Sequence, residues 1–313
     1  MSNRFDFQGE GKRTNYFEGW YVKCTDREND LSIALIPGVS HFSDSQSFVQ
    51  YNIHYKNKSY SGKINFDRNH FEVVPEPYSI IMPKFVLSES GVKASLIDED
   101  NHILLDFSFG PLQPIRQTAY MPSIMGPLEY IKVPCSHDIV SMKHTVKGKL
   151  VLNGEEINVD SGVGYMEKDR GSTFPSNYLW LQTNTFTENS EASLSLAVAT
   201  IEKKPLKITG FYAVFNDGIK EHRFSTYLGS RFDVVVDNNE VGYSVQIRGR
   251  NKILEVKVEL SNVSELIAPM NEGMDFPIKE TVKSSLEMTF KEKGKAEVKL
   301  TSENAAAELV NWV

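Results

Sequence analysis

The sequence has little cysteine and no long apolar run. Only Cys24 and Cys135 occur, too few for a disulfide-stapled module and without the CxxC spacing of a metal or redox site. No apolar run approaches the roughly 18 residues of a membrane span, and the N-terminus lacks the apolar core of a signal peptide. We therefore expect a cytoplasmic protein with reduced thiols and no transmembrane segment, for which peripheral membrane contact stays open.

Positive charge is also scarce. Lys and Arg total 34 against 41 Asp and Glu, so the net charge is −7 and the pI is near 5.6. Because a polyanion would be repelled on average, we expect no nucleic acid partner. The seven histidines are scattered, and the chain has no HExxH, GxSxG or phosphate-loop motif. These absences predict no metal and no nucleotide.

Short segments of alternating apolar and polar residues fill most of the chain. With 313 residues, 40% of them hydrophobic, the chain is long enough for two domains. The segments are rich in Val, Ile, Phe and Tyr and end at turn residues, as is typical of strands joined by hairpins. They cover residues 48–55, 102–109, 179–186, 194–201, 208–215, 231–236, 243–248 and 253–260, with turns expected at 98–101, 216–218 and 237–240. This pattern predicts an all-β protein of antiparallel barrels or sandwiches.

Helical patterns are rare. Residues 302–313, which contain three successive alanines, give the best one, and residues 124–131 give a short turn at most. Residues 111–134 contain five prolines, a density that does not fit a central strand. We expect the chain to cross there between two domains, residues 1–135 and 136–313.

The first segment that combines aromatics, glycine and a carboxylate is residues 15–23. In an extended strand Tyr16, Glu18 and Trp20 share one face, so Glu18 would lie beside two aromatic side chains. One interpretation is a barrel strand whose tryptophan fills the barrel floor. The other is that Glu18 lines an apolar cavity that raises its pKa.

The second segment, residues 126–142, contains His137 next to Asp138. Neighbours in a strand face opposite ways, so adjacency alone cannot make them a catalytic dyad. A hydrogen-bonded structural role for His137 is favoured over a catalytic one. Cys135 as a thiol nucleophile has no support from adjacency either.

The third segment, residues 164–186, carries two rows of polar side chains. Tyr165, Glu167 and Asp169 alternate along one strand, and Trp180, Gln182 and Asn184 alternate along the next. Such rows are costly to bury unless every group has a partner, so they indicate either a satisfied structural network or a ligand site. The residues alone slightly favour the network. Lys168 faces away from Glu167 in this register, which predicts a solvated or salt-bridged side chain.

Taken in order, the three segments resemble the tocopherol cyclase family. The resemblance rests on YFEGWY at residues 16–21, on PCSH within residues 126–142, and on GYMEKD at 164–169 followed by WLQTN at 180–184. It implies two lipocalin-like antiparallel β-barrel or sandwich units packed together with few short helices, as in the carotenoid hydratase and Diels-Alderase relatives, around an apolar cavity. It also implies a compact bacterial-type member. Arg170 departs from the pattern, because the family usually has Trp there.

The resemblance further implies cofactor-independent ring closure. An acid protonates a prenyl double bond, and a phenolic oxygen attacks to form a chromanol, which makes the reaction an isomerisation. Glu18 and Glu167 are the candidate acids, since a buried carboxyl stays protonated when its pKa is raised. His137 is the candidate proton relay, and Asp169 is expected to stay ionised beside Arg170 and brace the loop.

Aromatic faces would stabilise the developing carbocation. The residues expected to contact the substrate are Tyr16, Trp20, Tyr165 and Trp180, together with Gln182 and Asn184, which would orient the phenol. The alternative is a non-catalytic carrier of a prenylated or other apolar small molecule, because a cavity of this kind can bind without reacting. A carrier needs the cavity but no buried acid.

Overall fold

The computed structural model describes residues 4–43, 45–203, 206–237, 239–270 and 273–312. Antiparallel strands make up nearly all of the regular structure, and the described residues contain three short 3-10 helices. The chain forms two compact units. Unit 1 consists of Met1–Ile115, Lys132–Phe174 and Leu266–Pro277, and unit 2 of Arg116–Ile131, Pro175–Glu265 and Ile278–Val313. The all-β prediction is confirmed.

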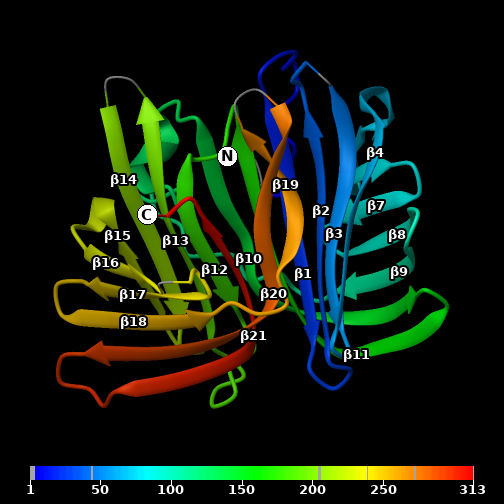
Figure 1. Ribbon diagram of the computed structural model, residues 1–313. Coiled ribbons are helices and arrows are strands. Elements are labelled where there is room, and N and C mark those ends of the chain that lie inside the picture. The colour runs from blue at the N-terminus through cyan, green and yellow to red at the C-terminus, as the bar shows by residue number, and fades with distance from the viewer. Residues whose placement is uncertain (1–3, 44, 204–205, 238, 271–272, 313) are drawn as a thin grey trace. The chain divides into compact units, whose positions relative to one another are not determined.

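Unit 1 is built on an eleven-stranded antiparallel sheet (Figure 1). In spatial order its strands are β4 (Lys58–Asp67), β3 (Gln46–Tyr55), β2 (Leu31–Ser40), β1 (Phe17–Asp26), β11 (Glu155–Gly171), β10 (Cys135–Leu152), β9 (His102–Phe109), β8 (Gly91–Ile97), β7 (Phe85–Ser88), β6 (Tyr78–Met82) and β5 (Glu72–Pro75), with the 3-10 helix η1 (Arg68–His70) before β5. β1 and β11 are neighbours although they lie far apart in the sequence. This pairing brings the three sequence motifs of unit 1 side by side.

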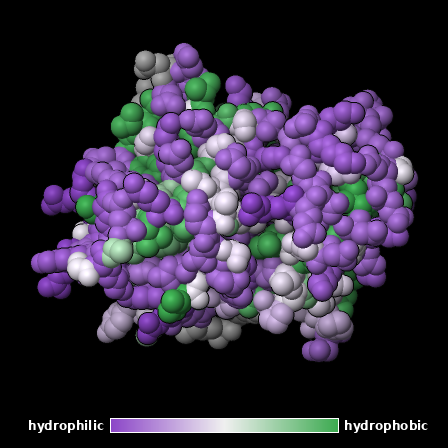
Figure 2. All heavy atoms as spheres, turned by 90° about the horizontal axis from the view of Figure 1, so that it is seen from below, coloured by the Kyte–Doolittle hydropathy of each residue, from purple (hydrophilic) through white to green (hydrophobic). Residues whose placement is uncertain are grey.

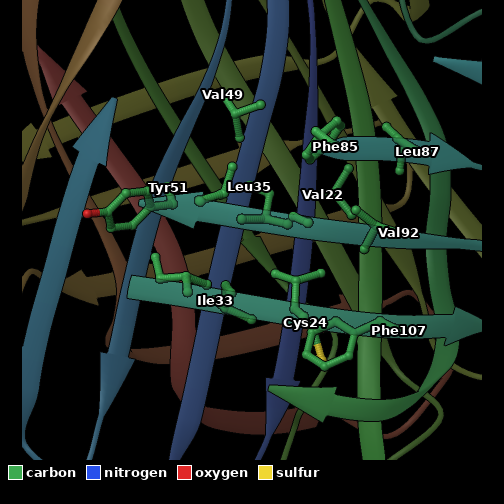
Figure 3. Packing of buried hydrophobic residues seen from close by; sticks show 14 of the residues in the cluster. Val22, Cys24, Ile33, Leu35, Val49, Tyr51, Phe85, Leu87, Val92 and Phe107 are labelled. Atoms are coloured by element: carbon green, nitrogen blue, oxygen red, sulfur yellow. The ribbon is translucent and has the colours of Figure 1, made fainter. Parts of the chain in front are cut away.

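The sheet of unit 1 curls so that strands from its two halves pack on each other. Figure 3 shows Val22 and Leu35, from β1 and β2, facing Phe85 and Val92, from β7 and β8. Burial along β9 alternates strictly, so this strand has one buried face. By contrast, nine of the ten residues of β1 are buried. β1 therefore has a second buried face, which does not belong to this apolar core.

Unit 2 is built mainly on a second antiparallel sheet. Its strands in spatial order are β15 (Glu221–Ser225), β14 (Leu206–Asn216), β13 (Ser193–Lys203), β12 (Asn177–Thr183), β21 (Val298–Val310), β20 (Gly273–Glu292), β18 (Lys252–Glu259), β17 (Gly242–Arg248) and β16 (Arg231–Val236), while β19 (Ser264–Met270) pairs with β20. The 3-10 helices η2 (Gly126–Tyr130) and η3 (Thr226–Leu228) belong to the same unit. Its core includes Leu181, Leu196 and Val256.

All eight segments predicted as strands overlap a strand, although residues 184–186 lie beyond the end of β12, and the short turn near residue 126 is η2. The predicted C-terminal helix is wrong, because those residues lie in β21. There Ala306 pairs with Gln182 of β12, and the flanking strand β20 pairs with β21 on its other side. Hydrogen bonding to two neighbours overrides the helical preference of an alanine run. The turn predicted at 237–240 includes residue 238, which lies outside the described residues.

The compact units do not divide the chain once at residue 135, since residues 116–131 belong to unit 2 and 132–174 to unit 1. Whether residues 1–135 and 136–313 behave as separate domains stays a prediction. On the face shown in Figure 2, hydrophilic residues predominate and hydrophobic ones form separate patches. No helix within the described part of the chain has the length and apolar character needed to span a bilayer.

Candidate functional site

One face of three neighbouring strands carries some of the polar residues of the second and third motifs. In β11 the side chains of Tyr165, Glu167 and Asp169 alternate onto this face. His137 of β10 lies directly opposite Asp169, and Tyr21 of β1 lies opposite Glu167. Residues directly opposite in an antiparallel pair share a face, so the sheet itself brings these side chains together.

Four of these side chains form a continuous chain of polar contacts. His137 Nδ1 is 2.9 Å from Asp169 Oδ1, and its Nε2 is 3.4 Å from Glu167 Oε2. The Tyr165 hydroxyl donates to the same Glu167 oxygen at 2.5 Å. Tyr165 is fully buried, and the side chains of Glu167 and His137 are 6% and 14% exposed. The partner of His137 is thus Asp169 of β11, whereas the adjacent Asp138 lies opposite Lys168.

His137 carries positive charge at neutral pH. Burial by itself lowers the pKa of the imidazole, but the Asp169 and Glu167 carboxylates outweigh it and raise the pKa to about 9. Both ring nitrogens then donate, one towards each carboxylate. The arrangement holds a proton between two carboxylates at a buried position. It can therefore move a proton to or from a group bound beside Glu167.

An apolar cluster borders this polar chain on the same face. Phe17, Phe42, Phe48 and Met274 are its buried members, with Cys135, Phe174 and Ile267 packed against it. Gly19 lies opposite both Asp169 and Gly38, and Gly38 lies opposite Phe48. A side chain at Gly38 would strike the Phe48 ring, which shows that this ring lies over the glycine. Charged and apolar groups thus lie within one row of residues.

A segment remote in sequence covers part of this face. The Gln50 side chain of β3 accepts from Ile267 N at 2.8 Å and donates to Ile267 O at 2.9 Å. Phe174 N donates to Pro269 O at 2.8 Å. Sequence analysis missed this contribution, and no local pattern could have shown it, because Gln50 and Ile267 are 217 residues apart.

The opposite face of β1 and β11 holds a second network, centred on Glu18. Its carboxylate lies 2.9 Å from Lys168 Nζ, with both side chains fully buried, and accepts from the Tyr16 hydroxyl at 2.5 Å. Lys168 also donates to Asp6 O at 2.6 Å, and Trp20 Nε1 donates to Phe5 O at 2.9 Å. Burial lowers the pKa of Lys168, and Glu18 opposes that effect.

Glu18, Tyr16 and Trp20 are therefore not on the face of His137. One interpretation of the sequence placed Glu18 in an apolar cavity, but its carboxylate contacts the Lys168 ammonium group. Lys168, predicted to be solvated or salt-bridged, is salt-bridged and buried. Arg170 also belongs to this second face and lies 3.5 Å from Asp138. Arg170, which stands where the family usually has Trp, therefore takes no aromatic ring away from the His137 face.

The remaining expected residues lie in unit 2. Trp180 and Gln182 lie on one face of β12, and the core residues Leu179 and Leu181 lie on its other face. Asn184 follows the strand. All three are buried. That they join the unit 1 residues in one site stays a prediction.

A divalent cation could be held by one group of side chains. Ligand atoms of His137, Glu167 and Asp169 all lie within 4.8 Å of one another. Each of these side chains already has a protein partner in the polar chain. The contacts account for the cluster without an ion, and the expectation of no metal stays a prediction.

Comparison with known proteins adds the family. The sequence model of the tocopherol cyclase-like family matches residues 90–310, more than half of the chain. The chain belongs to the tocopherol cyclase-like family. Within that match lie β10 and β11, which carry all four members of the polar chain. No curated protein matches the sequence.

Solved structures share the fold of this tocopherol cyclase-like protein at low identity. A protein of Nitrosomonas europaea assigned as AttH is 15% identical, covers 99% of this chain and 97% of its own, and has a TM-score of 0.56. CghA in complex with Sch210972 is 9% identical, covers 94% and 88%, and has a TM-score of 0.61. Kievitone hydratase of Nectria haematococca is 9% identical, covers 99% and 94%, and has a TM-score of 0.56. These likenesses confirm the expected pair of lipocalin-like units.

Proposed function

We propose that the protein is a cofactor-independent enzyme of the cyclase or hydratase type, which protonates a double bond of an apolar substrate. The proposed substrate is a prenylated quinol, which closes to a chromanol. One observation carries the proposal: the buried chain Tyr165–Glu167–His137–Asp169 adjoins the apolar cluster around Phe48. Family membership and a structural neighbour named as a hydratase support it, because hydration and ring closure both begin with protonation of a double bond.

Glu167 is the proposed acid. It takes a proton from His137 Nε2 and gives it to the less substituted alkene carbon, and the carboxylate that remains is stabilised by the Tyr165 hydroxyl. The phenolic oxygen then attacks the cationic carbon, and its proton returns through Glu167 to His137 Nε2, which restores the charged imidazole. No atom is gained or lost. Asp169 holds the imidazole in place and stabilises its charged form.

The apolar cluster has two tasks in this reaction. It excludes water, which strengthens every charge interaction within the site. The ring faces of Phe17 and Phe48 would stabilise the carbocation by about 0.5 to 2 kcal/mol each. Trp180 is the proposed third ring, and Gln182 and Asn184 are proposed to orient the phenol.

The first test is conversion of a synthetic prenylated quinol, followed by mass spectrometry and ultraviolet absorption. We expect a product of unchanged mass with a shifted spectrum. Glu167→Gln should abolish it while the thermal midpoint stays within a few degrees. The matched control is Glu156→Gln, on the exposed end of the same strand, which should convert normally.

Two outcomes would overturn the proposal. Unchanged turnover by Glu167→Gln would remove Glu167 from the role of acid. Tight binding of a quinol that is recovered unaltered after incubation would indicate the carrier.

A further inference from the structure

Unit 2 contains a pocket that shares no residue with the proposed active site. It is a groove of about 460 Å³ that opens widely to solvent. The lining residues are Phe211, Thr226, Ser230, Arg231, Phe232, Asp233 and Arg248. They come from β14, β16 and β17 and from the connection that contains η3.

The pocket lies at the open ends of the sheet. β15 and β16 are its two terminal strands, and β15 pairs with β14 only from Tyr212 to Asn216. Phe211, the next residue of β14, is beyond that pairing. Its ring centroid is 5.0 Å from that of Phe232 on β16. An aromatic pair therefore bridges the place where the sheet does not close by hydrogen bonds.

The charges around the pocket do not balance. Arg231 and Arg248 lie directly opposite each other on β16 and β17, and like charges in that position destabilise a sheet. Asp233 pairs with Arg248 at 2.5 Å. The Arg231 side chain has no hydrogen-bond or ion-pair partner among the residues that the structure describes. The exposed Arg231 guanidinium lies next to an apolar floor and is open to a ligand.

We propose that this pocket binds a small amphipathic monoanion, a carboxylate on an aromatic or alkyl body. Arg231 would bind the carboxylate through its fork of N–H groups. The hydroxyls of Thr226 and Ser230 lie at the same pocket and can donate to the second oxygen. The apolar body would lie on Phe211 and Phe232. A neutral ligand of the same shape would leave the charge imbalance in place.

The test uses 4-phenylbutyrate as probe, titrated into the full chain by isothermal calorimetry, with its neutral amide as the matched ligand. We expect the carboxylate to bind and Arg231→Gln to weaken it at least about tenfold, the value of one charged hydrogen bond. The amide should bind wild type and Arg231→Gln equally weakly. Lys257→Gln, an exposed change on β18, is the control variant and should retain full affinity.

Further variants separate this pocket from other sites. Phe232→Leu, which trims the floor, should weaken carboxylate and amide alike, and Glu167→Gln should leave both affinities unchanged. No detectable binding of the carboxylate, or equal affinity of wild type and Arg231→Gln for it, would overturn the proposal. Because no step involves turnover, the result does not depend on the proposed reaction.

Discussion

At the scale of single residues, alternation along β11 gives neighbouring side chains opposite roles. Glu167 and Asp169 face the apolar cluster and share a protonated histidine, while Lys168, between them, is buried on the other face against Glu18. One strand thus carries the proposed proton relay on one side and a buried ion pair on the other. Of the two candidate acids, Glu167 contacts a histidine and Glu18 contacts a lysine.

The pH dependence of turnover should report on His137. Its pKa is raised to about 9. The imidazole that supplies the proton is therefore charged at neutral pH, and this charge is lost as the pH rises through about 9. We expect kcat to be level from pH 7 to 8 and to fall above that range. His137→Gln should be slower at every pH and lack this alkaline limb. A wild-type profile that is flat to pH 10 would exclude His137 as the relay.

The Glu18–Lys168 pair should behave as a structural unit. Removing one partner leaves the other charge buried, so Glu18→Gln and Lys168→Met should each lower the free energy of unfolding by about 3 to 5 kcal/mol. The double variant should be more stable than either single one, as urea titration can measure. If Glu18→Gln keeps its stability but loses turnover, Glu18 is the acid.

At the scale of elements, the hairpin of β10 and β11 positions the site. It supplies all four members of the polar chain, and register shifts between Ile139, Ser141 and His144 interrupt its pairing just beyond the site. Bulges of this kind re-aim side chains next to functional groups. The alternation of apolar and polar residues is a local property, so the strands could be predicted from the sequence. The register that places His137 opposite Asp169 could not, because it depends on these bulges.

Gly171, at the end of β11, should tolerate no side chain. Its φ is 157°, and an added Cβ would lie 2.0 Å from the Pro134 carbonyl oxygen. Gly171→Ala should cost about 2 kcal/mol or more of stability through backbone strain and should impair turnover, because Asp169 is two residues away. The control is Gly154→Ala in the hairpin turn, which also has a positive φ but no atom within 4 Å of the added carbon. Equal losses in both variants, measured by urea unfolding, would contradict the steric argument.

At the scale of the whole molecule, buried histidines should limit stability on both sides of neutrality. Burial lowers the pKa of His144 to about 4, so its contribution is present above about 6.5 and is lost as the pH falls towards 4. His137, with a pKa raised to about 9, contributes below about 6.5, and that contribution is lost as the pH rises through 9. Each is worth roughly 3 kcal/mol. The thermal midpoint should therefore be highest near pH 6.5.

Variants can separate the two limbs of that stability profile. His144→Gln should flatten the acid limb and leave the alkaline one. His102→Gln, an exposed change at the start of β9, should alter neither. An acid limb that persists unchanged in His144→Gln would assign it to other groups, such as His41 and His222, whose pKa values burial also lowers.

The sequence by itself determined the strands, the antiparallel class and the face on which Tyr165, Glu167 and Asp169 project, because alternation is a local property of an extended chain. It did not determine that residues 302–310 are a strand, since only pairing with β12 and β20 makes them one. It also could not separate Glu18 from Glu167, because the ion partner of the first and the histidine of the second come from other strands. Those contacts exist only once β1, β10 and β11 are neighbours, and long-range pairing leaves no trace in the local pattern of residues.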